Sequence, residues 1–237
     1  MLAMEIKTEM QLRIAEIFHS VQGEGQYVGT PSVFVRTTGC NLRCWFCDTP
    51  YTSWNPEGSH TTVAEILRQV EQFECEHVVI TGGEPLLQPN VVQLSEALQQ
   101  AGHYITFETA GTVFLPVAAN LISLSPKLSN STPKDHPVWS QRHETVREAP
   151  DVIRRLVSEY PYQLKFVIDV PEDLSDVKTY LNRSPEISLS NVFLMPQGIS
   201  AEVVQEKMKW LTELADKLGC QVSPRLHVEL FGNERGK

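Results

Sequence analysis

The chain has 237 residues, a formal net charge of -9 at pH 7 and a hydrophobic fraction of 41%. Such a composition predicts one globular domain with a sizeable core, and the acidity argues against a nucleic-acid-binding protein, which needs a surplus of Lys and Arg. Since the sequence lacks a signal peptide and an apolar run long enough to span a bilayer, we expect a cytoplasmic protein without a membrane partner. We expect residues 1–237 to form a single domain, in which Met1–Met10 is an N-terminal extension of no evident function.

Short apolar runs alternate with segments of helical periodicity along the chain. We expect strands at residues 33–36, 78–81, 104–108, 121–125, 164–168, 192–195 and 221–223. We expect helices at residues 63–73, 91–101, 145–160, 173–182 and 201–218. Thr62 and Glu65 have the spacing of a capping box before the first helix. Residues 129–142, rich in Pro, Ser and Asp, are expected to form a surface loop.

This alternation of strands and helices predicts a parallel sheet covered by helices. Polar segments follow four of the strands directly, at residues 81–85, 108–111, 125–127 and 195–198. In a βα barrel, ligands bind at the rim formed by the carboxyl ends of the strands. Because fewer than eight βα units are found, we expect an incomplete, open barrel of the TIM type. A doubly wound sheet is the alternative.

Three of the five cysteines, Cys40, Cys44 and Cys47, lie within eight residues of one another. In a reducing compartment such crowding indicates metal or cluster ligation rather than disulfides. Three thiolates on one loop can ligate three irons of a cubane cluster and leave the fourth iron for a chelating ligand, whereas ordinary electron-transfer clusters are closed by four cysteines. Cys75 and Cys220 are expected to be structural.

A structural zinc site is the alternative for these cysteines. Zinc usually takes four ligands from paired C-x-x-C knuckles, but this loop has one x3 and one x2 spacing. His60 is the one nearby candidate for a fourth ligand, and its spacing fits no usual pattern. The aromatic residues Trp45 and Phe46 are expected to shield a cluster and so to tune its potential.

Two motifs together resemble the radical S-adenosylmethionine (SAM) superfamily. The segment Cys40–Cys47 resembles its CxxxCxxC signature, and Gly82-Gly83-Glu84-Pro85 resembles its GGE motif, which contacts the amino group of SAM. The resemblance implies a [4Fe–4S] cluster held by Cys40, Cys44 and Cys47, with SAM bound at the open iron.

Within that superfamily the chain resembles the 7-carboxy-7-deazaguanine synthase family. The likeness extends over most of the chain through QGEG, FVR-x-x-GC, CDT, VITGGEP, ETAGT and SPK. It implies a reduced barrel, a homodimer, a requirement for Mg²⁺ and an external electron donor of the flavodoxin or ferredoxin type. The implied reaction converts 6-carboxy-5,6,7,8-tetrahydropterin to 7-carboxy-7-deazaguanine in queuosine biosynthesis, with ring contraction and loss of ammonia.

The same resemblance assigns site residues. At the SAM site it places Phe46, Cys47, Asp48, Gly83, Glu108, Ser125, Pro126, Lys127, Met195, Pro196, Gln197 and Gly198. At the pterin it places Val21, Gln22, Gly23, Glu24, Arg36 and Thr81, and it assigns Thr49 as the Mg²⁺ ligand. Arg36 suits a bidentate pair with a carboxylate, and Gln22 and Glu24 suit the guanidine-like edge of a pterin. In the C-terminal tail, Arg225 and His227 are weaker candidates.

Two other functions are compatible with parts of the sequence. A glycyl-radical-enzyme activase shares CxxxCxxC but acts on a protein, and it has no use for QGEG or CDT. A non-catalytic iron–sulfur or zinc module has no use for GGEP or SPK. We therefore expect an enzyme that acts on a small molecule.

Overall fold

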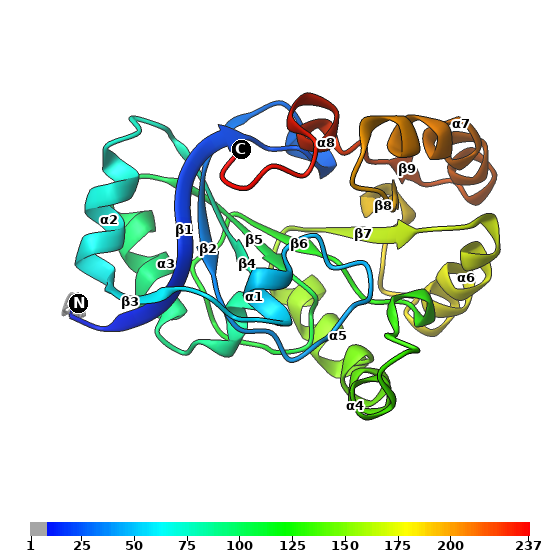
Figure 1. Cartoon of the computed structure of the whole chain (residues 1–237), viewed down its shortest axis with the longest axis horizontal. Coiled ribbons are helices and arrows are strands. Elements are labelled where there is room, and N and C mark those ends of the chain that lie inside the picture. The colour runs from blue at the N-terminus through cyan, green and yellow to red at the C-terminus, as the bar shows by residue number, and fades with distance from the viewer. Residues whose placement is uncertain (1–8) are drawn as a thin grey trace.

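Within residues 9–237, which are the residues that the structure describes, nine strands form one mixed sheet, shown in the computed structural model of Figure 1. The strands are β1 (Gln11–Val21), β2 (Pro31–Thr37), β3 (Ser59–Thr62), β4 (His77–Gly82), β5 (Tyr104–Thr109), β6 (Leu121–Leu124), β7 (Tyr162–Ile168), β8 (Val192–Pro196) and β9 (Gln221–Val222). Their order across the sheet is β3-β1-β2-β4-β5-β6-β7-β8-β9. Residues 1–8 of the expected N-terminal extension lie outside the described residues.

Helices surround the sheet, and most of them lie on its outer face (Figure 1). They are α1 (Pro50–Ser53), α2 (Val63–Glu71), α3 (Val91–Gln100), α4 (Pro137–Arg147), α5 (Pro150–Glu159), α6 (Leu174–Arg183), α7 (Ala201–Leu218) and α8 (Leu226–Phe231). In Figure 1, α2 and α3 cover the end of the sheet near β1, and α6 and α7 cover the end near β8 and β9.

The strand order identifies the architecture as a partial TIM-type βα barrel. From β2 to β9, neighbouring strands are parallel and follow chain order, apart from β3, which pairs with β1 at the edge. A doubly wound sheet would reverse its order in the middle, so that alternative is wrong. The barrel is open between β1 and β9, and the segment after β1 bridges the gap: the Gly25 amide donates to Ser223 Oγ (2.8 Å) and the Leu226 amide donates to the Gly23 carbonyl (2.9 Å).

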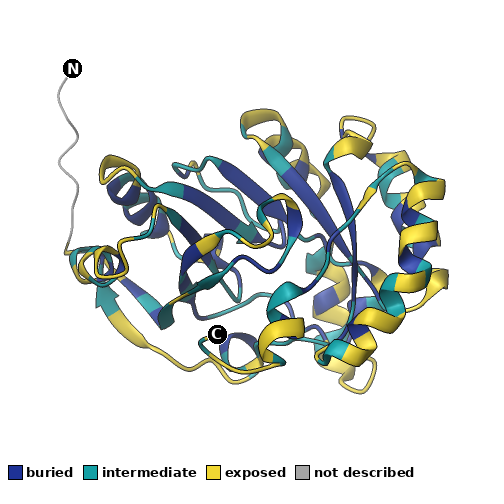
Figure 2. Cartoon of the chain, turned by 90° about the horizontal axis from the view of Figure 1, so that it is seen from above, coloured by how far each residue is buried: buried dark blue, intermediate teal, exposed yellow. Residues whose placement is uncertain are grey.

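Strict alternation along the strands separates the core from the barrel interior. In β7, for example, Leu164, Phe166 and Ile168 pack in the hydrophobic core beneath the helices, whereas Lys165 and Val167 face the interior. Figure 2 shows the result: the central strands are largely buried, and exposure is concentrated on the outer faces of the helices and on the loops. Because side chains in a strand alternate between faces, a polar residue between apolar ones points into the barrel.

All seven expected strands are present, and β1 and β3 are two further strands that were not expected. In β1 the register shifts between Ile14 and Glu16, where a β-bulge lies opposite β2. The bulge breaks the apolar alternation, since Leu12 and Ile14 are buried in the core whereas the next apolar residue that packs against it is Ile17. The strand β3 is short and polar and therefore carries no apolar signal.

The segment expected to form one helix at 145–160 is divided between two helices, and the loop expected at 129–142 is wrong from residue 137 onward. One helix, α4, begins at Pro137 and ends at Arg147, and a second, α5, begins at Pro150. Ala149 precedes this proline and is not helical (φ -131°, ψ 66°), because a residue before proline avoids the helical conformation. The Thr62 cap is confirmed, since its side chain accepts a hydrogen bond from the Glu65 amide (3.2 Å).

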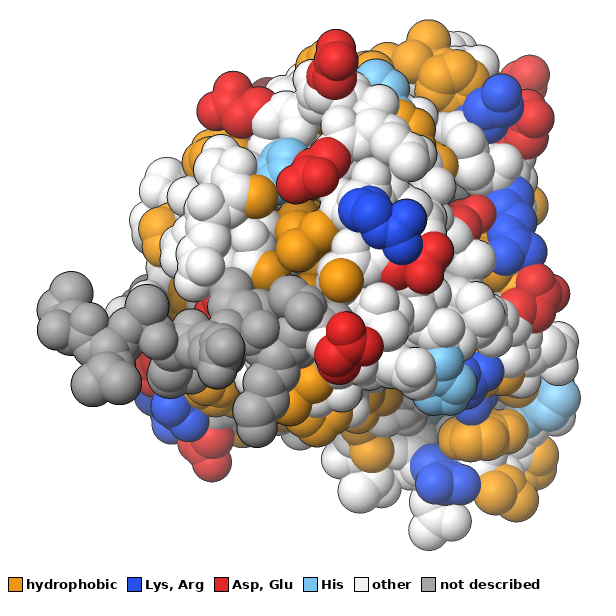
Figure 3. Space-filling model, turned by 90° about the vertical axis from the view of Figure 1, so that its left-hand side faces the viewer, with side chains coloured by type: hydrophobic (Ala, Val, Ile, Leu, Met, Phe, Trp, Pro, Cys, Tyr) orange, Lys and Arg blue, Asp and Glu red, His pale blue; other side chains and the backbone are white. Residues whose placement is uncertain are grey.

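On the face shown in Figure 3, acidic and basic side chains are interspersed and form no basic patch. Within residues 9–237, no helix combines the length and apolar character needed to cross a membrane.

Candidate active site

A cavity of about 500 Å³ lies at the carboxyl ends of the parallel strands. Inward-facing residues of five strands reach it: Arg36 (β2), Thr81 (β4), Glu108 (β5), Lys165 (β7) and Met195 (β8). The cysteine loop, the loop after β1 and the C-terminal tail complete its wall. The cavity therefore lies at the rim where a βα barrel binds its ligands.

Most residues predicted for the site line this cavity. They are Val21, Gln22, Gly23, Glu24, Arg36, Cys40, Cys44, Phe46, Cys47, Asp48, Thr49, Thr81, Gly83, Glu108, Ser125, Lys127, Met195 and Gln197. Three predicted SAM-site residues, Pro126, Pro196 and Gly198, are buried and do not line it. One of them acts through its backbone, because the Gly198 carbonyl accepts a hydrogen bond from Arg225.

Hydrogen bonds to residues 129–147 hold the cysteine loop from outside. The Arg43 amide donates to His143 Nδ1 (3.1 Å), and the Trp45 amide donates to the Ser131 carbonyl (3.1 Å). His143 Nε2 in turn pairs with Ser131 Oγ (2.8 Å). Helix α4, which the sequence analysis did not predict, thus supports the loop that carries the three cysteines.

The two aromatic residues of the loop differ in position. Phe46 lines the cavity, as a residue that shields a cluster should. Trp45 is 52% exposed and does not line the cavity, and its indole nitrogen donates to the Asn130 carbonyl (2.6 Å). The expectation that both shield the cluster is therefore wrong for Trp45.

The five cysteines are free thiols, and the three in the loop line the cavity. Burial raises the pKa of the Cys44 thiol to about 12 and that of the Cys40 thiol to about 11. These thiols are therefore neutral until a metal displaces their protons, so cluster assembly must release protons. Cys75 and Cys220 lie outside the cavity and pack against the core, as expected of structural cysteines.

The donor set does not fit a single zinc ion. Zinc ligands converge on one point at about 2.0–2.3 Å, and in residues 9–237 no three His, Cys, Asp or Glu side chains converge in that way. His60 is exposed on β3 and does not line the cavity. Three separated thiols beside an open cavity fit a multi-iron cluster with one free coordination position better.

His143 is buried and neutral, and this predicts a pH dependence of stability. Burial lowers its pKa from 6.5 to about 4. Below pH 6.5 the unfolded chain binds a proton that the folded chain excludes, so the contribution of His143 is complete above pH 6.5 and is lost as the pH falls toward 4. We expect His143→Gln to flatten the decline of the melting temperature over this range relative to the wild type. Melting curves of both proteins that stay parallel between pH 8 and pH 4 would contradict this.

The GGEP turn is fixed by a buried carboxylate. Glu84 is fully buried, and its oxygens accept hydrogen bonds from Thr109 Oγ1 (2.8 Å), the Ala110 amide (2.9 Å) and the Leu86 amide (3.1 Å). Burial raises the pKa of Glu84 despite these bonds. Since Glu84 does not line the cavity, it holds the turn against β5 and leaves Gly83 to face the ligand.

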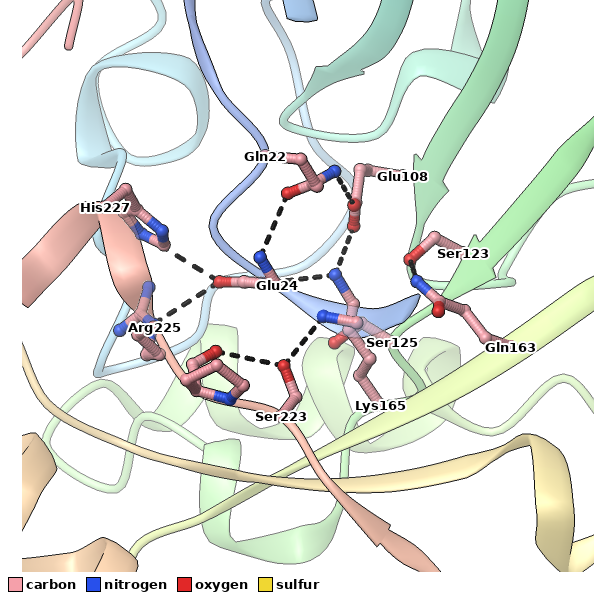
Figure 4. A network of polar contacts seen from close by, with 12 residues as sticks. Gln22, Glu24, Glu108, Ser123, Ser125, Gln163, Lys165, Ser223, Arg225 and His227 are labelled. Carbon is pink, nitrogen blue, oxygen red and sulfur yellow. Dashed lines mark hydrogen bonds and ion pairs between the residues drawn. The ribbon is translucent and has the colours of Figure 1, made fainter. Parts of the chain in front are cut away.

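A buried lysine joins two predicted site carboxylates, as Figure 4 shows. Lys165 Nζ lies 2.7 Å from Glu24 Oε2 and 2.7 Å from Glu108 Oε2. Gln22 connects the same residues, because its Nε2 donates to Glu108 Oε1 (3.3 Å) and its Oε1 accepts from the Glu24 amide (3.2 Å). Lys165 was missed, although its sequence signal was visible as a charged residue between Leu164 and Phe166.

Arg225 and His227 lie on the other side of Glu24. Arg225 Nε is 3.4 Å from Glu24 Oε1, its Nη2 pairs with Asp48, and His227 Nε2 is 4.0 Å from the same Glu24 oxygen. Burial raises the pKa of Glu24, but Lys165 and Arg225 outweigh this and hold it well below its usual value. Both weaker candidates of the sequence analysis thus belong to the wall of the cavity.

Arg36 and the C-terminal tail meet at Glu16. Arg36 Nε lies 2.7 Å from Glu16 Oε1, and Arg235 Nε lies 3.1 Å from Glu16 Oε2. Arg235 also pairs with Glu57 (2.8 Å) and lies over the ring of Tyr51 (4.0 Å). The tail, residues 232–237, therefore closes one side of the cavity, a placement that the sequence analysis did not provide.

The remaining predicted ligands lie beside the cysteine loop. Thr49 Oγ1 is 3.9 Å from Cys47 Sγ and accepts a hydrogen bond from Thr52 Oγ1 (3.4 Å). Lys127 Nζ donates to the carbonyl and hydroxyl oxygens of Ser125 (2.8 Å each). A hydroxyl and an ammonium group thus face the cavity next to the thiols.

Comparison with known proteins identifies the family. Residues 34–128 match the model of the radical SAM superfamily. A 7-carboxy-7-deazaguanine synthase from Rhodopirellula baltica is 46% identical over 97% of this chain and 90% of its own length. The chain belongs to the 7-carboxy-7-deazaguanine synthase family. As a radical SAM enzyme of this family, it uses a [4Fe–4S] cluster and SAM and acts on a small molecule.

Further comparisons agree with this membership. A 7-carboxy-7-deazaguanine synthase from Halobacterium salinarum is 40% identical over 94% of this chain and 91% of its own length. The crystal structure of QueE from Escherichia coli superposes with a TM-score of 0.71 and 21% identity, over 94% of this chain and 97% of that one. At that identity the structural likeness supports the fold, and the family assignment rests on the sequence relatives.

Proposed function

We propose that the protein converts 6-carboxy-5,6,7,8-tetrahydropterin to 7-carboxy-7-deazaguanine, as a carbon–nitrogen lyase in queuosine biosynthesis. The observation that carries this proposal is the composition of one cavity. The QGEG loop, Arg36 and Thr81 line it together with three thiols and the GGEP turn. A radical formed from SAM at a cluster held by these thiols would therefore arise beside groups suited to a carboxylated pterin.

In this proposal Cys40, Cys44 and Cys47 hold the cluster, and the GGEP turn, Glu108, Ser125-Pro126-Lys127 and the segment 195–198 surround SAM. When bound, the cluster and SAM supply the 5′-deoxyadenosyl radical that removes hydrogen from the substrate. The protein orients both ligands and excludes water. An external electron donor of the flavodoxin or ferredoxin type and a homodimeric assembly remain predictions of the family resemblance.

The proposed pterin side presents the carboxylate of Glu24 and the guanidinium group of Arg36. Glu24 is ionised, so it can accept hydrogen bonds from the amino and ring N–H groups of a pterin. The Arg36 guanidinium donates to Glu16 through Nε. Within residues 9–237 its two terminal nitrogens have no hydrogen-bond partner, so they can donate to the substrate carboxylate. Glu16 would then orient the guanidinium toward the substrate.

We further propose that Thr49 ligates Mg²⁺. A hard, partly hydrated cation needs few protein ligands when a substrate carboxylate supplies another oxygen, and Thr49 lines the cavity beside Cys47. Thr49→Val keeps the shape but removes the oxygen. We expect normal cluster content and SAM cleavage without substrate, and about a 10–100-fold loss of Mg²⁺-dependent ring contraction. A variant whose response to Mg²⁺ equals that of the wild type would contradict the assignment.

Anaerobic reconstitution followed by product analysis tests the overall function. The reconstituted enzyme, supplied with SAM, Mg²⁺, reductant and 6-carboxytetrahydropterin, should release 7-carboxy-7-deazaguanine and 5′-deoxyadenosine. Cleavage of SAM without any conversion of the pterin would overturn the proposed substrate. In that case the activase alternative would be tested by the formation of a glycyl radical on a partner protein.

A further inference from the structure

Lys165 joins the two halves of the cavity through one buried ammonium group. Its side chain is 1% exposed and comes from the middle of β7, where it faces the barrel interior. One contact is Glu24, in the loop after β1 on the proposed pterin side, and the other is Glu108, near the end of β5 on the proposed SAM side. Figure 4 shows the ammonium group between the two carboxylates.

The two carboxylates depend on this cation. Glu24 and Glu108 lie close together because both contact the same nitrogen at 2.7 Å. Like charges at such a separation repel strongly when they are shielded from water, and a buried charge that loses its partner is destabilised. Burial lowers the pKa of Lys165, but Glu108 and Glu24 outweigh it and keep the group charged.

The fold itself does not require Lys165 to hold the loop. The backbone of the QGEG loop has its own anchors: the Gly25 amide donates to Ser223 Oγ (2.8 Å) and the Gln26 amide donates to Gln163 Oε1 (2.9 Å). Gly25 has a φ of +71°, and a Cβ there would meet Gln163 Nε2 at 2.3 Å. These contacts position the main chain. The direction of the Glu24 side chain is set by Lys165 Nζ at 2.7 Å from Oε2, together with the longer contact of Arg225 Nε at 3.4 Å from Oε1.

We propose that Lys165 is a positioning residue that locks the pterin-side carboxylate Glu24 to the SAM-side carboxylate Glu108 and so aligns the two ligands for hydrogen transfer. This inference rests on the proposed function. Without the ammonium group, SAM and the pterin would each keep their other contacts with the protein. Their positions relative to one another would no longer be linked through Lys165 Nζ. The 5′-deoxyadenosyl radical would then still form, but a smaller share of the radicals would remove hydrogen from the pterin.

The test compares Lys165→Met and Lys165→Arg with Lys178→Met, a matched substitution of an exposed lysine on α6. For each reconstituted enzyme, iron content, melting temperature, pterin KM, kcat and the 5′-deoxyadenosine formed per product are measured. We expect Lys165→Met to keep its cluster, to form more 5′-deoxyadenosine per product than the wild type, and to lose about a hundredfold in product formation. Lys165→Arg should recover part of the coupling, because a guanidinium can bridge two carboxylates. Lys178→Met should match the wild type.

If Lys165→Met does not fold, Lys165→Gln replaces it, because its amide can still donate to one carboxylate, and the same uncoupling is expected. A folded Lys165→Met or Lys165→Gln variant with the wild-type ratio of 5′-deoxyadenosine to product would overturn the inference and leave the proposed function intact. A wild-type enzyme that cleaves SAM but forms no 7-carboxy-7-deazaguanine would overturn the proposed function instead.

Discussion

Cys44→Ala is expected to lose the iron–sulfur chromophore and SAM cleavage together. Cys44 is nearly buried at the cavity wall, and replacing it leaves two thiols for a cluster that needs three protein ligands. Iron and sulfide analysis, the visible absorption spectrum and a SAM cleavage assay under anaerobic conditions measure the effect. We expect residual activity below about one per cent of the wild type, as for loss of the group that carries the chemistry.

The matched control for this variant is Cys220→Ala. Cys220 is a half-buried thiol after α7 that packs against the core and lies outside the cavity. Its replacement should lower stability slightly, by the loss of a small buried group, and leave the iron content unchanged. A Cys44→Ala protein with full iron content and SAM cleavage would overturn the assignment of the cluster to this loop.

Gly83→Ala is expected to disturb the cysteine loop directly, through a clash with its main chain and not through contact with a bound ligand. A Cβ at residue 83 would lie 2.3 Å from the carbonyl oxygen of Gly39 and 2.8 Å from that of Thr52. Both atoms belong to the main chain beside the cysteine loop, so the loop or the GGEP turn must move, at a cost of about 1–3 kcal/mol in the free energy of unfolding. Because Cys40 and Ser53, which directly follow these two residues in the chain, line the cavity, we expect poor cluster retention and SAM cleavage reduced about a hundredfold.

Gly102→Ala separates this clash from the cost of backbone strain. Gly102 follows α3 with a φ of +90°, and a Cβ there would meet no atom within 4 Å. Only the strain of about 1–2 kcal/mol for a left-handed alanine is expected, with full iron content and activity. Denaturant unfolding, iron analysis and SAM cleavage measured on both variants compare the two effects. Equal losses of cluster in both would show that close contact at Gly83 is not the cause.

The motif residues could be predicted from sequence because the constraints on them are local. Cys40, Cys44 and Cys47 share one loop, and their spacing already requires a common ligand. Thr81 and Glu108 lie at the ends of apolar strands, and the carboxyl ends of parallel strands must meet at one rim. For such residues, the spacing within one loop and the direction of the strands are sufficient to predict that they share a site.

Elements with weak local signals were decided by tertiary contacts. The strand β1 carries a bulge that breaks its alternation, and β3 is polar. Both nevertheless extend the sheet, because β2 offers unpaired backbone groups to β1, and β1 in turn offers them to β3. Pro150 separates α4 from α5, which allows α4 to place His143 against the Arg43 amide. In that position His143 supports the cysteine loop from a helix whose first six residues, 137–142, were expected to belong to a surface loop.

The sequence by itself determined the cluster motif and most residues of the rim, and it favoured an open barrel over a doubly wound sheet. Only the tertiary structure decided how Lys165 and Arg225 enclose Glu24, since these pairs are 141 and 201 residues apart in the chain. A buried charge must be paired, but its sequence neighbours do not indicate which partner it meets. That choice depends on closure of the open barrel, where β7, the loop after β1 and the segment after β9 converge on one desolvated carboxylate.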